Sequence, residues 1–166
     1  MRFVLLAPLG AALLAGCASY DGRGLVAGKA TTADVEALMG RPAERVAKPD
    51  GGSVLYYPRG PAGRQSYAVL LGPDGRLQTI EQRLTDASLA KIVLGTTTAP
   101  EVRELLGPPP TTSSLPRLGR DVWEYKMGDS ALPFVLWVQF SADGIVREVF
   151  KAKDQEIEGK SGRGHH

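Results

Sequence analysis

Four carboxylates have a spacing that could support acid–base chemistry, and they fall in two matching places. Asp34 and Glu36 begin one short helical segment, and Glu101 and Glu104 begin another. General acid–base catalysis would need such a carboxylate within reach of a reacting group. However, a Thr stands three residues before Asp34 and another three before Glu101, which is the spacing of a helix cap. We therefore interpret these acids as capping or solvent-facing residues.

Nucleophilic and metal chemistry have few candidate residues in this chain. Its one Cys is Cys17, and its two His are the final residues, His165 and His166. Unless that chain end folds back, a Ser-His-Asp triad, a Cys-His pair and a His-based zinc site are excluded. The 20 basic and 18 acidic residues nearly balance, which disfavours a nucleic-acid partner. We expect no enzyme activity, no metal site and no small-molecule cofactor.

The first residues, "MRFVLLAPLGAALLAGC", place one positive charge before an apolar run that ends near Cys17. The run is shorter than the ~20 residues that span a bilayer, so it indicates a secretory signal. The sequence Leu14-Ala15-Gly16-Cys17 resembles the bacterial lipobox. That resemblance implies that Cys17 becomes the diacylated first residue of a mature chain, and Ala18 implies sorting to the outer membrane. The alternative is an ordinary secretory signal with an incidental Cys.

A repeated phrase organises the remainder of the chain. Residues 31–42 read "TTADVEALMGRP" and residues 98–109 read "TAPEVRELLGPP". Each phrase predicts a two-turn helix that begins at a Thr cap and ends at Gly40 or Gly107. Apolar strand-like runs follow each helix, and Asp74-Gly75 and Asp143-Gly144 predict tight hairpin turns in them. Short apolar segments before each phrase, "GLVAG" and "DASLAKIVLG", predict a partner helix.

These signals predict an α+β fold, a tandem repeat of two helix-helix-three-stranded antiparallel meander units. The expected boundaries are a signal peptide at 1–16, a tether at 17–24, repeats at 25–83 and 86–151, and a disordered polar tail at 152–166.

The phrases "GKATTADVEALMGRP" and "LYY", with "LLGPP", "WEY" and "VQFSADG" in the second copy, resemble the BamE (SmpA/OmlA) family of outer-membrane lipoproteins. The resemblance covers residues 25–151 and implies a role beside the machinery that inserts β-barrel proteins, with contact to anionic lipid. The chain differs in carrying two copies. Tandem domains of this shape also resemble the secreted inhibitors of β-lactamases, which bind an enzyme with a concave sheet.

Strand-like residues 134–140 are apolar at alternate positions on both faces, which a strand covered on one side would not need. Val135 and Trp137 point to the second face. We expect the other repeat to cover that face, and a partner-binding surface is the alternative. Trp123 and Tyr125 share one face of the preceding strand-like segment, and we expect them to be core aromatics packed under the helix. Stacking on the ring of a ligand is the alternative.

The loop "GPPPTTSSLPRLGRD" carries two basic residues, Arg117 and Arg120. It is expected to be either a partner contact or a solvated connector. The candidate partner-binding residues are therefore Val135, Trp137, Arg117 and Arg120.

The sequence as a whole predicts a non-catalytic outer-membrane lipoprotein that faces the periplasm and is held to the membrane through Cys17. It would bind another envelope protein, which the family resemblance implies to be the barrel-assembly machinery, and so support outer-membrane protein assembly or envelope integrity. The alternative is an inhibitor-like or scaffold lipoprotein with a different envelope protein or enzyme as its partner.

Overall fold

A computed structural model describes residues 21–60, 63–129 and 131–154 of the chain. Cys17, which carries the lipidation prediction, and the two terminal His lie outside these ranges. The elements, in chain order, are α1 (Thr32–Met39), β1 (Glu44–Ala47), β2 (Ser53–Pro58), β3 (Ser66–Leu71), β4 (Leu77–Gln82), α2 (Asp86–Leu89), α3 (Ala99–Leu106), β5 (Thr111–Leu115), the 3₁₀ helix η1 (Pro116–Leu118), β6 (Arg120–Met127), β7 (Phe134–Ser141) and β8 (Val146–Lys153). None of these helices has the length and apolar character needed to cross a membrane.

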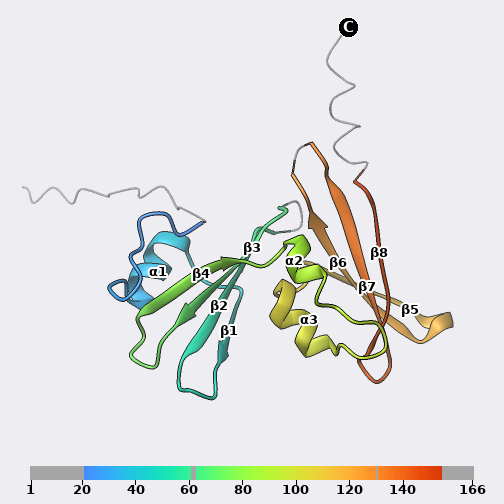
Figure 1. Cartoon of the computed structure of the whole chain (residues 1–166), viewed down its shortest axis with the longest axis horizontal. Coiled ribbons are helices and arrows are strands. Elements are labelled where there is room, and N and C mark those ends of the chain that lie inside the picture. Colours follow the sequence, from blue (N-terminus) through green and yellow to red (C-terminus); the bar gives the residue numbers. More distant parts are fainter. Residues whose placement is uncertain (1–20, 61–62, 130, 155–166) are drawn as a thin grey trace, which may run out of the picture.

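The strands form two four-stranded antiparallel sheets, ordered β1-β2-β3-β4 and β5-β6-β7-β8 (Figure 1). The predicted units of two helices and three strands are therefore wrong. Each half has a fourth strand, and the segment expected to form the first partner helix, residues 24–28, consists of turns and irregular backbone. Gly24 and Gly28 both have positive φ, which interrupts a helix there. The second partner helix is reduced to the four residues of α2.

The missed strands, β1 and β5, are both at a sheet edge. All five residues of β5 are exposed, as are three of the four in β1. An edge strand without a buried face has no alternation of apolar and polar residues to reveal it. The Pro-rich segment interpreted as a loop therefore contains β5, η1 and the start of β6.

The capped helices are formed as predicted. The Asp34 carboxylate accepts hydrogen bonds from the Thr31 N–H at 2.8 Å and the Thr31 hydroxyl at 2.7 Å. At α3, Glu101 accepts from the N–H of Thr98 at 2.7 Å and from its hydroxyl at 2.8 Å. These bonds satisfy donors at the helix start that have no intrahelical partner.

Acid should weaken both caps. The Thr31 N–H and then its hydroxyl lower the pKa of Asp34 below 3.8, and the same groups of Thr98 lower the pKa of Glu101 below 4.5. A lowered folded-state pKa gives stability that is complete above the ordinary pKa and is lost as pH falls through the folded value. We expect the melting temperature of an Asp34→Asn/Glu101→Gln variant to fall less than that of the wild type between about pH 6 and about pH 2.5. Equal falls in differential scanning calorimetry would contradict this expectation.

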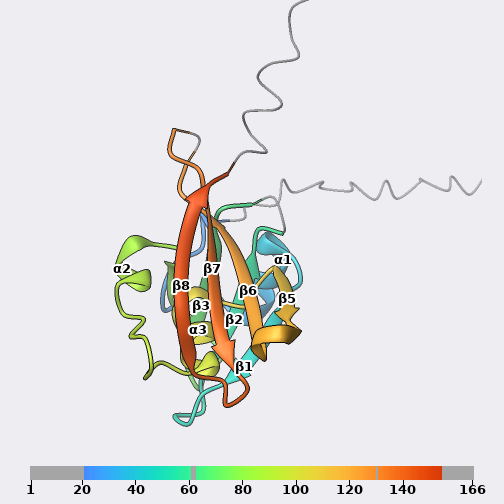
Figure 2. The ribbon, with the colours of Figure 1, turned by 90° about the vertical axis from the view of Figure 1, so that its right-hand side faces the viewer.

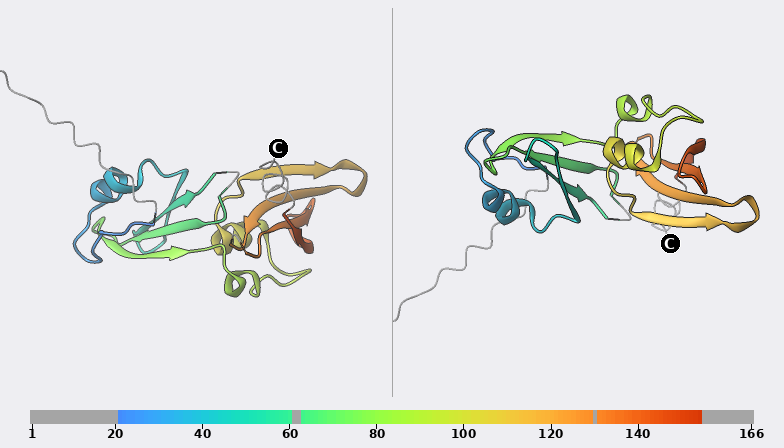
Figure 3. Two further views of the ribbon diagram at one scale, coloured as in Figure 1. Left: turned by 90° about the horizontal axis from the view of Figure 1, so that it is seen from above. Right: turned by 90° about the horizontal axis from the view of Figure 1, so that it is seen from below.

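The buried residues show that α3 lies between the two sheets. The face of the first sheet that lies away from α3 packs against α1, with Val35 and Met39 among the core residues. Val102 and Leu106 of α3 belong to the core of the second sheet. On the opposite side of α3, Arg103 forms an ion pair with Glu44 of β1 at 2.7 Å. Figures 1 and 3 show the resulting order of α1, first sheet, α3 and second sheet.

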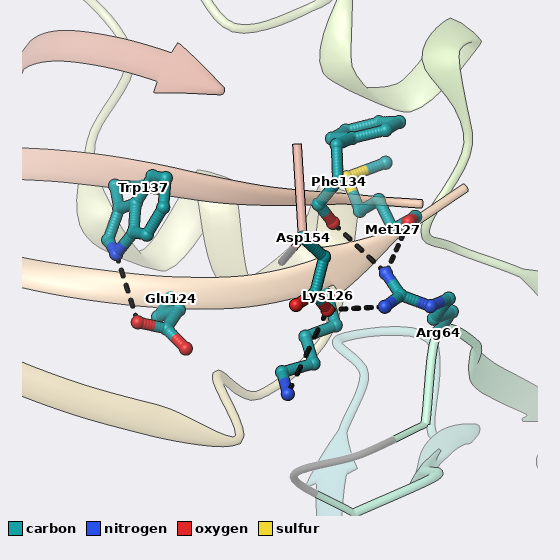
Figure 4. A network of polar contacts seen from close by, with 7 residues as sticks. All are labelled: Arg64, Glu124, Lys126, Met127, Phe134, Trp137 and Asp154. Carbon is teal, nitrogen blue, oxygen red and sulfur yellow. Dashed lines mark hydrogen bonds and ion pairs between the residues drawn. The ribbon is translucent and has the colours of Figure 1, made fainter. Parts of the chain in front are cut away.

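A second junction between the halves is centred on Arg64, just before β3. Its guanidinium forms a hydrogen-bonded ion pair with Asp154 and donates to the carbonyl oxygens of Met127, at 2.8 Å, and Phe134, at 3.2 Å (Figure 4). The side chains of Arg64 and Asp154 are only 13% and 4% exposed. The ordered structure thus continues past the expected boundary at residue 151, through the end of β8 to Asp154.

Candidate functional site

The outer face of the second sheet is the strongest candidate for a binding surface. It consists of alternate residues from the three long strands, which we call the Trp137 face: Arg120, Val122, Glu124 and Lys126 of β6, Val135, Trp137 and Gln139 of β7, and Glu148, Phe150 and Ala152 of β8. Helix α3 covers the opposite face. Figure 2 views the molecule from the Trp137 side, where no described helix or loop lies over the sheet.

Two aromatic rings form the centre of this face. Trp137 lies directly opposite Phe150 in the β7–β8 ladder, and their rings stack with centroids 4.9 Å apart and an interplanar angle of 19°. The Trp137 Nε1–H donates to Glu124 Oε2 at 2.9 Å (Figure 4). Phe150 remains 43% exposed. Stacking and a hydrogen bond already hold the indole in one orientation. Binding of a partner to it would therefore cost little side-chain conformational entropy.

Polar and aliphatic groups surround the rings. Arg120 donates from one guanidinium nitrogen to Gln139 and to Glu148, both at 2.8 Å. Val122 and Val135 on this face are almost fully buried. Longer side chains on the same face shield these short ones from solvent. The face therefore combines an apolar centre with a hydrogen-bonded polar rim, which is the usual anatomy of a protein interface.

The structure assigns the predicted residues to two places. Val135, Trp137 and Arg120 lie together on the Trp137 face. Arg117 lies in η1 at the tip of the β5–β6 hairpin, where neighbouring Leu118 is 62% exposed. The expectation that the other repeat covers the second face of β7 is wrong, because α3 lies between the halves. That arrangement leaves the Trp137 face open.

Sequence reasoning missed two members of the aromatic centre. Phe150 could have been found from the hairpin turn at Asp143-Gly144, which places it across from Trp137. Glu124 had no such signal, because its role depends on the register between β6 and β7. The interpretation of Trp123 and Tyr125 as core aromatics is confirmed, since Tyr125 is fully buried and Trp123 packs against the same core.

A cleft lies between α3 and the first sheet. This cleft of about 570 Å³ is lined by apolar residues of β1, β2 and β3, among them Val46, Val54 and Tyr56, and by Arg103 and charged neighbours. Burial raises the pKa of Tyr56, so its hydroxyl stays protonated at neutral pH. Arg103 is already held by Glu44 through bonds of 2.9 and 3.1 Å from Nε. The cleft therefore offers mainly apolar contact.

Metal-ligating side chains do not gather in the described residues, where no group of three or more His, Cys, Asp or Glu could hold an ion. Asp34 and Glu101, the best-placed acids of the sequence, are held by their Thr caps. The arrangement on the Trp137 face supplies contact area and hydrogen bonding.

Comparisons with known proteins yield little. No protein-family model and no curated protein matches the chain. A crystal structure of a DUF4309 family protein (YjgB) from Bacillus subtilis is similar at a TM-score of 0.32 and 22% identity, covering 80% of this chain and 84% of that one. The resemblances to the BamE (SmpA/OmlA) family and to the β-lactamase inhibitors are therefore wrong. The shared phrases encode helix caps and turns, which unrelated α+β proteins also need.

Proposed function

We propose that this protein is a lipid-anchored binding module that holds another envelope protein against its Trp137 face without catalysing a reaction. The observation that carries the proposal is the stacked pair of Trp137 and Phe150 on a sheet face that no described element covers. Aromatic residues with a hydrogen-bonding edge are the side chains that most often dominate binding energy. Assembly of outer-membrane proteins is not included, because it depended on the family resemblance alone.

The shape of the surface favours a macromolecular partner. A small ligand is usually enclosed in a concave pocket, whereas the Trp137 face is an open sheet with ion-paired Arg120 and Glu148 at its margin. Such rims exclude water from a central contact and contribute little energy themselves. A protein surface with an apolar patch of similar width fits this arrangement.

The predicted lipid anchor supports a location at the outer membrane. The lipobox-like residues before Cys17 would attach the domain to a membrane, and Ala18 favours the outer membrane as the expected location. Two acyl chains give stable anchoring, because each buried CH₂ contributes about 0.8 kcal/mol. In this proposal the partner is another protein at the same membrane, facing the periplasm.

Site-specific photocrosslinking tests the proposal. A benzoylphenylalanine at position 150, in the full lipidated chain in its own membranes, should capture one defined protein. The matched control carries the same group at Val93, which is 55% exposed but lies outside the Trp137 face. Capture of the same protein at both positions would contradict a specific face.

The captured partner, once purified, then allows a quantitative measurement. Trp137→Ala should weaken its binding about 30-fold, the effect of losing an interface hot spot of about 2 kcal/mol. Val93→Ala should leave affinity unchanged. Unchanged affinity of Trp137→Ala in isothermal titration calorimetry, with an unchanged melting temperature, would show that the partner binds elsewhere.

A further inference from the structure

Strand β5 is an edge strand of the second sheet, and it lacks the features that hinder strand pairing at the other three sheet edges. It pairs with β6 on one side only, and both views in Figure 3 show it at the margin of the second sheet with no described strand beyond it. Its residues, TTSSL, carry no charge and are all exposed. An edge strand presents free N–H and C=O groups that can pair with another strand.

The other three edges are blocked or charged. The ladders that hold β4 and β8 contain register shifts, which twist an edge away from pairing. Backbone bonds also occupy the first residue of each, because Leu77 pairs with Ala30 and Val146 pairs with Thr97. Strand β1 is four residues long and begins with the charged pair Glu44-Arg45. The β5–β6 ladder, in contrast, has an uninterrupted register.

Backbone N–H and C=O groups point alternately to the two sides of a strand, and this alternation identifies the groups of β5 that are free to pair. The Ser141 N–H donates to Ile145 O, so odd-numbered residues of β7 direct their backbone groups toward β8. Backbone direction alternates along each strand and between neighbouring strands of an antiparallel sheet. Following the ladder registers, Thr112 and Ser114 direct their N–H and C=O away from β6. Pro110 and Pro116, which lack an N–H, close the strand at both ends.

We propose that β5 of two copies of this chain pair antiparallel about Ser113, joining their second sheets into one continuous sheet. In this register Thr112 of one copy lies opposite Ser114 of the second copy, and the free groups of both residues bond to each other. Ser113 lies opposite its own counterpart. The two-fold axis places Ser113 beside its own symmetry mate and every other β5 residue opposite an uncharged residue of the second copy, so no like charges meet across the pair.

This inference goes beyond the proposed function: it takes the lipid anchor from that proposal but does not depend on a partner at the Trp137 face. Because the axis is perpendicular to the sheet, the two Trp137 faces would lie side by side on the same surface. One five-residue ladder buries little area, so the contact is weak in free solution. Anchoring both chains in one membrane raises their effective concentration.

Cysteine crosslinking of the full-length chain in its own membranes tests the register. Opposed residues of a non-hydrogen-bonded pair have Cα atoms about 4.5 Å apart, within disulfide reach. Under copper-phenanthroline oxidation, Ser113→Cys should give a covalent dimer on a non-reducing gel. Thr111→Cys should remain at the level of the wild type, whose only Cys is Cys17, because its counterpart would lie about 14 Å away. A mixture of Thr111→Cys and Leu115→Cys should again crosslink.

A backbone variant separates strand pairing from chance collision. Ser114→Pro removes an outward N–H without removing a bond to β6, and Pro is tolerated at such an edge position. In the Ser113→Cys background it should abolish the dimer, whereas Ser114→Val should retain it. Equal crosslinking of Thr111→Cys and Ser113→Cys, or no crosslinking of a folded Ser113→Cys chain, would overturn the proposal. Partner capture at position 150 would be unaffected by that result, so the two proposals fail separately.

Discussion

Replacing Arg64 with Met is expected to lower the free energy of unfolding by about 3–5 kcal/mol, the cost of removing one partner from a buried ion pair. The guanidinium holds the buried Asp154 carboxylate and also donates to two backbone carbonyl oxygens of the second half. Met keeps much of the apolar stem but none of the donors. The Nζ of Lys126 lies 3.9 Å from the Asp154 carboxylate and still partly compensates its charge in this variant. We therefore expect a loss in the lower part of this range.

Urea denaturation of the purified chain measures this loss, and Arg45→Met provides the matched control. Arg45 pairs with Glu36 at 2.7 Å, but both side chains are more than 40% exposed. An exposed pair contributes only about 0–1 kcal/mol because water and salt screen it. A second variant, Arg64→Met/Asp154→Leu, should recover part of the loss, since the Asp154 carboxylate is then no longer buried without its guanidinium partner. Equal destabilisation by Arg64→Met and Arg45→Met would refute the assigned role.

Gly107→Ala is expected to be more damaging than Gly40→Ala, although the two glycines end equivalent helices. Both have positive φ, 84° and 85°, so either substitution strains the backbone by about 1 kcal/mol. Only at Gly107 would the new Cβ meet the other half of the molecule, 2.5 Å from Ser66 Oγ. At Gly40 it would meet nothing within 4 Å. Overpacking at a buried contact adds about 1–3 kcal/mol.

The difference between the two variants therefore measures the contact between α3 and the first sheet. Thermal and urea unfolding should give losses of about 1 kcal/mol for Gly40→Ala and about 2–4 kcal/mol for Gly107→Ala. Ser66→Gly in the Gly107→Ala background should restore part of the loss by removing the clashing hydroxyl. If both alanine variants lose the same stability, the second sheet and its helix do not rest on the first sheet at this point.

The local elements could be predicted from the sequence more fully than the way these elements pack together. The caps at Thr31 and Thr98 and the turns at Asp74-Gly75 and Asp143-Gly144 need only residues close in the chain, so they could be predicted. Strands β1 and β5 could not be predicted, because an exposed edge strand has no apolar alternation. The contact from Arg64 to Asp154 joins residues 90 positions apart.

The candidate site was partly predictable for the same reason. Apolar residues on both faces of β7 identified Val135 and Trp137 as unusual. Whether the second face was covered depended on the position of α3, which no local pattern encodes. Arg120 belongs to the Trp137 face only because β6 pairs with β7 in the observed register.

The position of α3 between the sheets also has a consequence for synthesis. The first sheet is complete at Gln82, but the helix that lies over its second face is not made until residues 99–106. While the chain elongates from its N-terminus, Val54, Tyr56 and Ala68 therefore remain without their cover. For that interval the nascent chain presents an apolar surface to chaperones and to other unfinished chains. The order of synthesis thus makes the N-terminal half dependent on a helix that has yet to emerge.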